Sequence, residues 1–204
     1  MGLDAMVGFS VNLEQPIKVV ENWTSRKPLV HMPDIIPAGT SFNVALAMRG
    51  AGLEVKVIGT VGNDRRAGEL EQLITQSGLD ALFFPIREAT PITCSLIVPE
   101  NQDPTAHLRQ KLLRCKPEFH NHGALEQALA QISRQMELNE PYYVVATGVR
   151  EADLSLVSQF FRSQDLESRY RVLAPSMELI TDCPQVLEEL SFEMLALNNC
   201  EAEE

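Results

Sequence analysis

The chain has 204 residues, of which 45% are hydrophobic and 22% are charged, and its formal net charge is -11. This length fits one domain that can bury a core. The acidic balance argues against nucleic-acid backbones and anionic membranes as partners, because the chain has no basic surplus to pair with phosphate.

The cysteines and the hydropathy pattern indicate a cytoplasmic protein. The four cysteines lie in unrelated segments without a C-x-x-C pair, which argues against a zinc site or a disulfide framework and fits reduced thiols. No signal-peptide pattern opens the chain, and no apolar run approaches the length that spans a bilayer. We therefore expect a cytoplasmic chain with no membrane partner.

The first predicted element is a continuous apolar run, residues 5–11, that reads as a central strand buried on both faces. It leads into Asn12 and Glu14, which we expect just past the carboxyl end of that strand, where ligands bind in open α/β sheets. A carboxylate can accept two hydroxyl hydrogen bonds, which suits a vicinal diol. The alternative is that Glu14 is an ordinary surface acid.

Residues 18–21 and 28–31 then predict two edge strands joined by a turn.

Residues 37–62 read as a tight loop, a helix of small residues and a buried strand. Gly39 lets a ligand approach the main chain, while Thr40 and Ser41 are predicted to cap the helix. Asn43, in the first helical turn, is expected to direct its amide back toward the loop. These features predict a pocket floor with free N–H groups. The alternative is a tight loop without a ligand.

The helix of this stretch is predicted to pack its small residues on the sheet and to end at two glycines. The residues that recur at helical spacing are Val44, Ala47, Met48 and Ala51, and the glycines are Gly50 and Gly52. A second helix is predicted after Asp64, which we interpret as a structural cap, with Leu70, Leu73 and Ile74 inward and Gly78 at its end.

The remaining elements alternate between strand and helix. Strands are predicted at 82–85, 90–99, 142–146, 171–175 and 192–197, helices at 125–136 and 154–161, and an antiparallel return at 107–114. The basic residues of that return are interpreted as a solvated face in preference to a phosphate contact. The alternation predicts a mostly parallel sheet with helices on both faces.

The pattern Ala38-Gly39-x-x-x-Asn43-x-Ala45, followed by Gly52, Gly59, Gly62 and Asp64, resembles the N-terminal signature of the ribokinase-like (PfkB-type) carbohydrate kinases. The resemblance covers nearly all of this chain, which would cover only the N-terminal two-thirds of such a kinase. It implies a doubly wound ribokinase-like sheet in a single truncated domain, residues 1–204. It also implies a small β lid, at about 15–36 and 90–114, that covers the sugar and can form a homodimer contact.

The resemblance also implies the site residues. Asn12, Glu14, Gly39, Thr40 and Asn43 would bind a sugar or a nucleoside, and Glu14 stands where the family has an aspartate. Thr40 replaces the lysine of some relatives, and Thr147 falls where some place an acidic sugar contact, so the identity of the ligand stays open.

Asn198 and Glu201 match the family motif Asn-x-x-Glu, which organises magnesium-bound water and phosphate near ATP. The alternative is an acidic tail. The family phosphorylates a sugar hydroxyl with ATP, using an aspartate in Gly-Ala-Gly-Asp as the base. The only Gly-Ala-Gly here is 50–52, and Leu53 follows it.

We therefore expect the sugar-binding half of a kinase, without the base and without most of the ATP site, and inactive by itself. The alternative is a non-catalytic module of the same fold that binds a sugar or a nucleoside. A dinucleotide-binding dehydrogenase is disfavoured, because no Gly-x-Gly-x-x-Gly follows the first strand.

Overall fold

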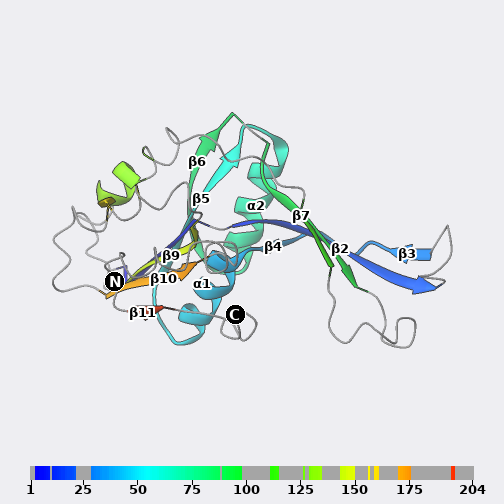
Figure 1. Cartoon of the computed structure of the whole chain (residues 1–204), viewed down its shortest axis with the longest axis horizontal. Coiled ribbons are helices and arrows are strands. Elements are labelled where there is room, and N and C mark those ends of the chain that lie inside the picture. Colours follow the sequence, from blue (N-terminus) through cyan, green and yellow to red (C-terminus); the bar gives the residue numbers. More distant parts are fainter. Residues whose placement is uncertain are drawn as a thin grey trace.

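The computed structural model describes residues 3–9, 11–21, 29–87, 89–97, 111–114, 126, 129–134, 143–149, 156, 159–160, 170–175 and 194–195. These residues form a central sheet that carries helices and a second sheet that extends away from it, here called the lid (Figure 1). The central sheet has six strands in the order β11-β10-β9-β1-β5-β6, and every pair is parallel. The predicted α/β class with a mostly parallel sheet is confirmed.

The strands of the central sheet follow the predicted order along the chain. Their bounds are Ala5–Gly8 (β1), Val55–Gly62 (β5), Asp80–Ile86 (β6), Tyr143–Val149 (β9), Tyr170–Pro175 (β10) and Met194–Leu195 (β11). β1 lies between β5 and β9, and its side chains Ala5, Met6 and Val7 are at most 1% exposed. Successive side chains of a strand point to opposite faces, so both faces of the sheet are covered at β1.

Two helices pack on one face of this sheet. α1 (Thr40–Gly50) and α2 (Arg65–Gln76) share a single core cluster with β1 and β5. Leu70 and Ile74 of α2 are fully buried, as the predicted inward face requires. In α1 the buried residues are Ser41, Phe42 and Ala45, whereas Ala47 and Ala51 are exposed. The predicted inward face of α1 was therefore right for Val44 and Met48, which pack against the core, and wrong for the two alanines. Phe42 supplies the large apolar side chain that packs on the sheet.

The two helices begin differently. Asp64 caps α2 through a hydrogen bond from the backbone N–H of Ala67 at 3.1 Å, as predicted. The N-cap of α1 is Gly39, which has no side chain to offer, so the predicted cap by Thr40 or Ser41 was wrong. Thr40 is the first helical residue and is exposed, while Ser41 is buried. Gly39 has a φ of 100°, a conformation that favours glycine.

The lid is a sheet of five strands. Four follow the order β3-β2-β7-β8, and β4 pairs separately with β2. Their bounds are Asn12–Glu21 (β2), Leu29–His31 (β3), Ile36–Ala38 (β4), Ile92–Ile97 (β7) and Lys111–Arg114 (β8). β2 pairs antiparallel with β3, and β8 returns antiparallel to β7, as the sequence predicted for both segments. β2 and β7 run parallel to each other.

The first predicted strand was too long. β1 ends at Gly8, and Asn12 and Glu14, which follow that end in the chain, belong to β2 of the lid. The physical reason is a period of two: Val11 and Leu13 are buried, whereas Asn12 and Glu14 are partly exposed. In the described parts of the chain, no helix is long and apolar enough to cross a membrane.

Candidate functional site

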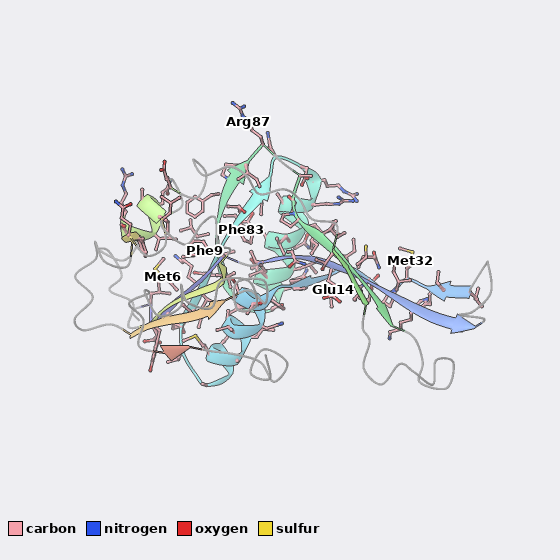
Figure 2. The ribbon with its side chains drawn as sticks, viewed as in Figure 1. Met6, Phe9, Glu14, Met32, Phe83 and Arg87 are labelled. Atoms are coloured by element: carbon pink, nitrogen blue, oxygen red, sulfur yellow. The ribbon has the colours of Figure 1, made fainter. Side chains whose placement is uncertain are left out.

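The base of the lid brings together two strands far apart in the sequence and the start of a helix. β2 pairs Glu14 with Thr93 of β7 on one side and Asn12 with Ala38 of β4 on the other. Ala38 immediately precedes Gly39, the N-cap of α1. Figure 2 shows Glu14 at the base of the lid and Met32 farther out, beside β3. The segments that carry Asn12, Glu14 and Gly39 are therefore adjacent at this junction.

The amide of Asn12 is fixed by two hydrogen bonds. Its Nδ2 donates to the backbone oxygen of Leu13 at 2.8 Å and to the hydroxyl of Thr93 at 2.9 Å. Thr93 in turn lies 3.4 Å from the oxygen of Leu13, to which it donates. A backbone carbonyl only accepts hydrogen bonds, so the amide nitrogen must face it. The amide oxygen of Asn12 therefore points elsewhere as an acceptor.

The carboxylate of Glu14 is held at one oxygen. The hydroxyl of Ser95, which is fully buried on β7, donates to Oε1 of Glu14. The side chain of Glu14 is partly exposed, and no hydrogen bond joins Oε2 to another residue in the described ranges. One carboxylate oxygen thus remains able to accept from a ligand.

The N-terminus of α1 lies beside these acceptors. No side chain caps it, and its first intrahelical bond runs from the N–H of Asn43 to the oxygen of Gly39 at 3.1 Å. The backbone N–H groups of a first helical turn carry partial positive charge and are donors. Thr40 and Asn43 are exposed on this turn, and no hydrogen bond joins Asn43 to Asn12 or Glu14. The junction therefore offers both acceptors and donors.

The predicted binding residues come from two parts of the fold. Asn12 and Glu14 lie on the lid sheet, and Asn43 lies on α1, which packs on the central sheet. The pairing of Asn12 with Ala38 links the two groups through the backbone.

Sequence reasoning missed Thr93 and Ser95. The available signal was a Thr-x-Ser pattern in a predicted strand, which places both hydroxyls on one face.

The remaining predicted site residues stand apart from this junction. Asn198 and Glu201 lie outside the described residues. Thr147 belongs to β9 of the central sheet. Within the described ranges, no group of three His, Cys, Asp or Glu side chains is placed to hold a metal ion.

The lid is anchored to the central sheet through Asp64. Its Oδ1 accepts from the Thr90 hydroxyl at 2.7 Å, and its Oδ2 accepts from the Thr90 backbone N–H at 2.9 Å. The same hydroxyl accepts from the N–H of Gly62 at 3.0 Å. The hydrogen bond from the Thr90 side chain is the largest cause that lowers the pKa of Asp64 below its ordinary value. Thr90 lies two residues before β7, so this contact sets where the lid strand begins.

Comparison by sequence finds no relative: no family model matches the chain, and no curated protein matches it. Comparison by structure finds many solved structures that are similar to this chain. Phosphofructokinase-2 from Escherichia coli, in complex with substrates and products, is 15% identical, has a TM-score of 0.67, and is matched over 91% of this chain and 58% of its own length. The same enzyme is known in complex with fructose-6-phosphate and in a tetrameric inhibited form.

Two further structures are also similar to this chain in fold at low sequence identity. A possible 1-phosphofructokinase from Thermotoga maritima is 15% identical, with a TM-score of 0.72, over 96% of this chain and 60% of its own length. A putative sugar kinase from Clostridium perfringens is 14% identical, with a TM-score of 0.61, over 100% of this chain and 60% of its own length. The chain therefore spans less than two-thirds of the length of the proteins it resembles.

The likeness in structure agrees with the motif between residues 38 and 64. At this level of identity it establishes the architecture. The chain has the ribokinase-like fold of the PfkB-type carbohydrate kinases.

Proposed function

We propose that this chain is the sugar-binding portion of an ATP-dependent carbohydrate kinase. Asn12, Glu14 and the N-terminus of α1 would hold the hydroxyl groups of a sugar or a nucleoside. The observation that carries this proposal is the state of the two side chains: each is fixed by a hydroxyl of β7 and keeps an oxygen able to accept from a ligand. A sugar hydroxyl both donates and accepts, so it can pair with these oxygens and with the donors of α1.

The roles of the three α1 residues differ in this proposal. Gly39 allows close approach of a ligand to the backbone, because it carries no Cβ. Thr40 and Asn43 are exposed on the first turn and would contact the ligand with their polar side chains. A sugar bound at the junction would therefore be covered by the lid and supported by the helix.

The reaction proposed for the whole kinase is transfer of the γ-phosphoryl group of ATP to a ligand hydroxyl. Asn198 and Glu201 would orient water bound to Mg²⁺, which prefers oxygen ligands and keeps several waters. Phosphoryl transfer also needs a group that takes the hydroxyl proton. The sequence offers no Gly-Ala-Gly-Asp for that role, so we expect this chain alone to bind the sugar without phosphorylating it.

A direct test incubates the purified chain with Mg²⁺-ATP and each of D-fructose, D-ribose and adenosine. The melting temperature and ADP formation are both measured. We expect at least one ligand to raise the melting temperature, because a ligand that binds only the folded state stabilises it, and we expect no ADP. Glu14→Ala should abolish the rise, whereas Glu71→Gln, an exposed acid on α2, should keep it. No rise with any ligand contradicts the proposed site, and ADP formation contradicts the absence of a base.

The second candidate function is a non-catalytic binding module with the same fold. It is favoured by the extent of the match, 58–60% of the length of the kinases compared. Stabilisation by a sugar without detectable affinity for Mg²⁺-ATP supports this candidate over the kinase portion. Binding of Mg²⁺-ATP by the same preparation supports the kinase portion.

A homodimer through the lid is part of the proposal. Among the described residues, six large hydrophobic side chains are exposed, and five of them belong to the first lid segment: Val20, Leu29, Val30, Met32 and Ile36. The outer part of this sheet extends away from the body of the molecule (Figure 1). Exposed apolar side chains gathered in one segment of the chain are typical of an interface. A second copy of the chain would cover them.

A further inference from the structure

We propose that Thr93 and Ser95 are positioning residues that hold Asn12 and Glu14 so that only acceptor oxygens face the ligand, which selects hydroxyl-bearing groups and excludes phosphate at this pair. This inference rests on the proposed function and specifies the ligand chemistry of the same site. It concerns two hydroxyl residues of the lid strand β7 that carry no role in the family pattern found in the sequence.

The side-chain amide of Asn12 has both of its donor hydrogens in hydrogen bonds within the protein. Its Nδ2 has two hydrogens, and both are taken, by the oxygen of Leu13 at 2.8 Å and by Thr93 Oγ1 at 2.9 Å. The Thr93 hydroxyl donates its hydrogen to the same backbone oxygen at 3.4 Å, and its own oxygen accepts from Asn12. Asn12 has no N–H left for a ligand, and its Oδ1 is what it presents.

The carboxylate of Glu14 is an acceptor at both oxygens when it is ionised. Ser95 donates to Oε1, and Ser95 is fully buried, so its hydroxyl is held in the sheet and cannot turn to solvent. A hydrogen bond with one charged partner is stronger than a neutral one and restricts the rotation of the carboxylate. Glu14 therefore presents Oε2 on the same face of β2 as the amide oxygen of Asn12.

Asn12 and Glu14 together determine which groups of a ligand can bind to them. Two acceptor oxygens on alternate residues of one strand match two hydroxyl donors of a polyol. A phosphate dianion has acceptor oxygens only. Beside Glu14 it would meet like charge, and neither Asn12 nor Glu14 has a side-chain donor left to offset that charge. A phosphorylated ligand would therefore place its phosphate away from the pair. The pair distinguishes a free hydroxyl end from a phosphorylated end.

The chain supplies a matched control within the same strand. Cys94 lies between Thr93 and Ser95, and its side chain points to the opposite face of the lid. It is a free thiol that is partly exposed. Cys94→Ala therefore removes one side-chain atom from the same strand, as Ser95→Ala does, without removing a contact to Glu14.

The binding test measures dissociation constants by calorimetry for D-fructose, D-ribose and adenosine with the wild type and four variants. We expect Ser95→Ala and Thr93→Val to weaken binding by about tenfold, since each removes a hydrogen bond that orders a ligand-binding side chain. Ser95→Thr, which keeps the hydroxyl, and Cys94→Ala should stay within about twofold of the wild type. Equal affinity of the wild type and Ser95→Ala overturns the inference while the proposed site stands.

A separate experiment uses fructose 6-phosphate to test whether Asn12 and Glu14 exclude a phosphate group. Glu14→Gln should weaken D-fructose and leave fructose 6-phosphate no tighter than in the wild type. If a phosphate occupies the pair, removal of the negative charge should tighten fructose 6-phosphate by at least about tenfold, because like-charge repulsion is lost. Such a gain overturns the assignment of hydroxyl groups to this pair.

A measurement without any ligand decides the positioning claim even where no sugar in the panel binds. The two side-chain amide protons of Asn12 are observed by NMR in the wild type, Thr93→Val and Thr93→Ser. We expect the Asn12 amide signals to move in the valine variant and to return in the serine variant, which restores the acceptor. Unchanged signals in Thr93→Val overturn the inference. Loss of sugar binding in the wild type, with the amide signals moving as expected, overturns the proposed function alone.

Discussion

The carboxylate of Asp64 accepts two hydrogen bonds from one residue, Thr90, at its backbone N–H (2.9 Å) and its hydroxyl (2.7 Å). Asp64 also caps α2 through the N–H of Ala67. The three contacts join the loop after β5, the start of α2 and the start of the lid strand β7. Because β7 supplies the hydroxyls that hold Asn12 and Glu14, the geometry of the candidate site depends on this anchor.

Loss of the Thr90 hydroxyl should destabilise the fold and loosen the lid. Thr90 is 2% exposed, and its hydroxyl both donates to Asp64 and accepts from the N–H of Gly62. Thr90→Val leaves that buried N–H without a partner, at a cost of about 1–3 kcal/mol in the free energy of unfolding. Thr90→Ser retains the hydroxyl and should lose less than half as much. Urea denaturation of both variants measures the difference, and equal losses would contradict the role of the hydroxyl.

The contribution of Asp64 to stability should depend on pH in the acid range. In the folded chain its pKa lies below the ordinary value of 3.8, chiefly because the Thr90 hydroxyl donates to it. A lowered folded pKa means that the stabilisation is complete above the unfolded pKa and is lost as the pH falls through the folded pKa. Asp64→Asn keeps a capping side chain but does not ionise.

The free energy of unfolding of the wild type and of Asp64→Asn should therefore differ by a constant amount between pH 7 and pH 5. Below about pH 4 the difference should shrink. Denaturation at a series of pH values measures it. A difference that stays the same at the lowest pH, or grows there, would show that ionised Asp64 is not the stabilising form.

The backbone of Gly39 should not tolerate a side chain. Its φ of 100° and ψ of 157° lie in a region essentially restricted to glycine, so Gly39→Ala should cost about 1–3 kcal/mol. It should also shift the start of α1 relative to Asn12. Gly68, in the interior of α2, has open space around an added Cβ, so Gly68→Ala should stabilise the chain by about 0.5–1 kcal/mol. Thermal denaturation separates the two, and a neutral Gly39→Ala would contradict this requirement.

Much of the fold was readable from the sequence. The order of strands and helices, the parallel central sheet and the cap at Asp64 follow from local patterns: apolar runs for buried strands and Asp64 three residues before Ala67. The face of α1 was only partly readable. Val44 and Met48 pack against the core as predicted, whereas the two alanines at the same helical spacing are exposed. Phe42, which the prediction did not include, is buried.

The candidate site could be predicted only in part, because its residues are far apart in the sequence. Asn12 and Thr93 are 81 residues apart, and only the pairing of β2 with β7 brings them together. The placement of Asn12 and Glu14 in a second strand had a local signal in the sequence, the alternation of apolar and polar residues from Val11 to Glu14. That alternation predicts the start of another strand after Gly8.

The lid should hold a second copy of the chain through its exposed apolar side chains. Leu29 and Met32 are 55% and 58% exposed. Leu29→Lys combined with Met32→Lys should convert a dimer into a monomer, because charged side chains would have to be desolvated in the interface. Leu46→Lys, at the exposed apolar residue of α1, should leave the dimer intact. Sedimentation velocity measures the mass, and a wild type that is monomeric at high micromolar concentration would contradict the interface.

The most direct test of the account is where a sugar binds. The backbone amides of the chain are followed by NMR while D-fructose, D-ribose or adenosine is added. We expect the largest shifts at Asn12–Glu14, Thr93–Ser95 and Gly39–Asn43, the three segments that meet at the base of the lid. Shifts confined to other segments, or no shift with any of the three ligands, would contradict a sugar site at this junction.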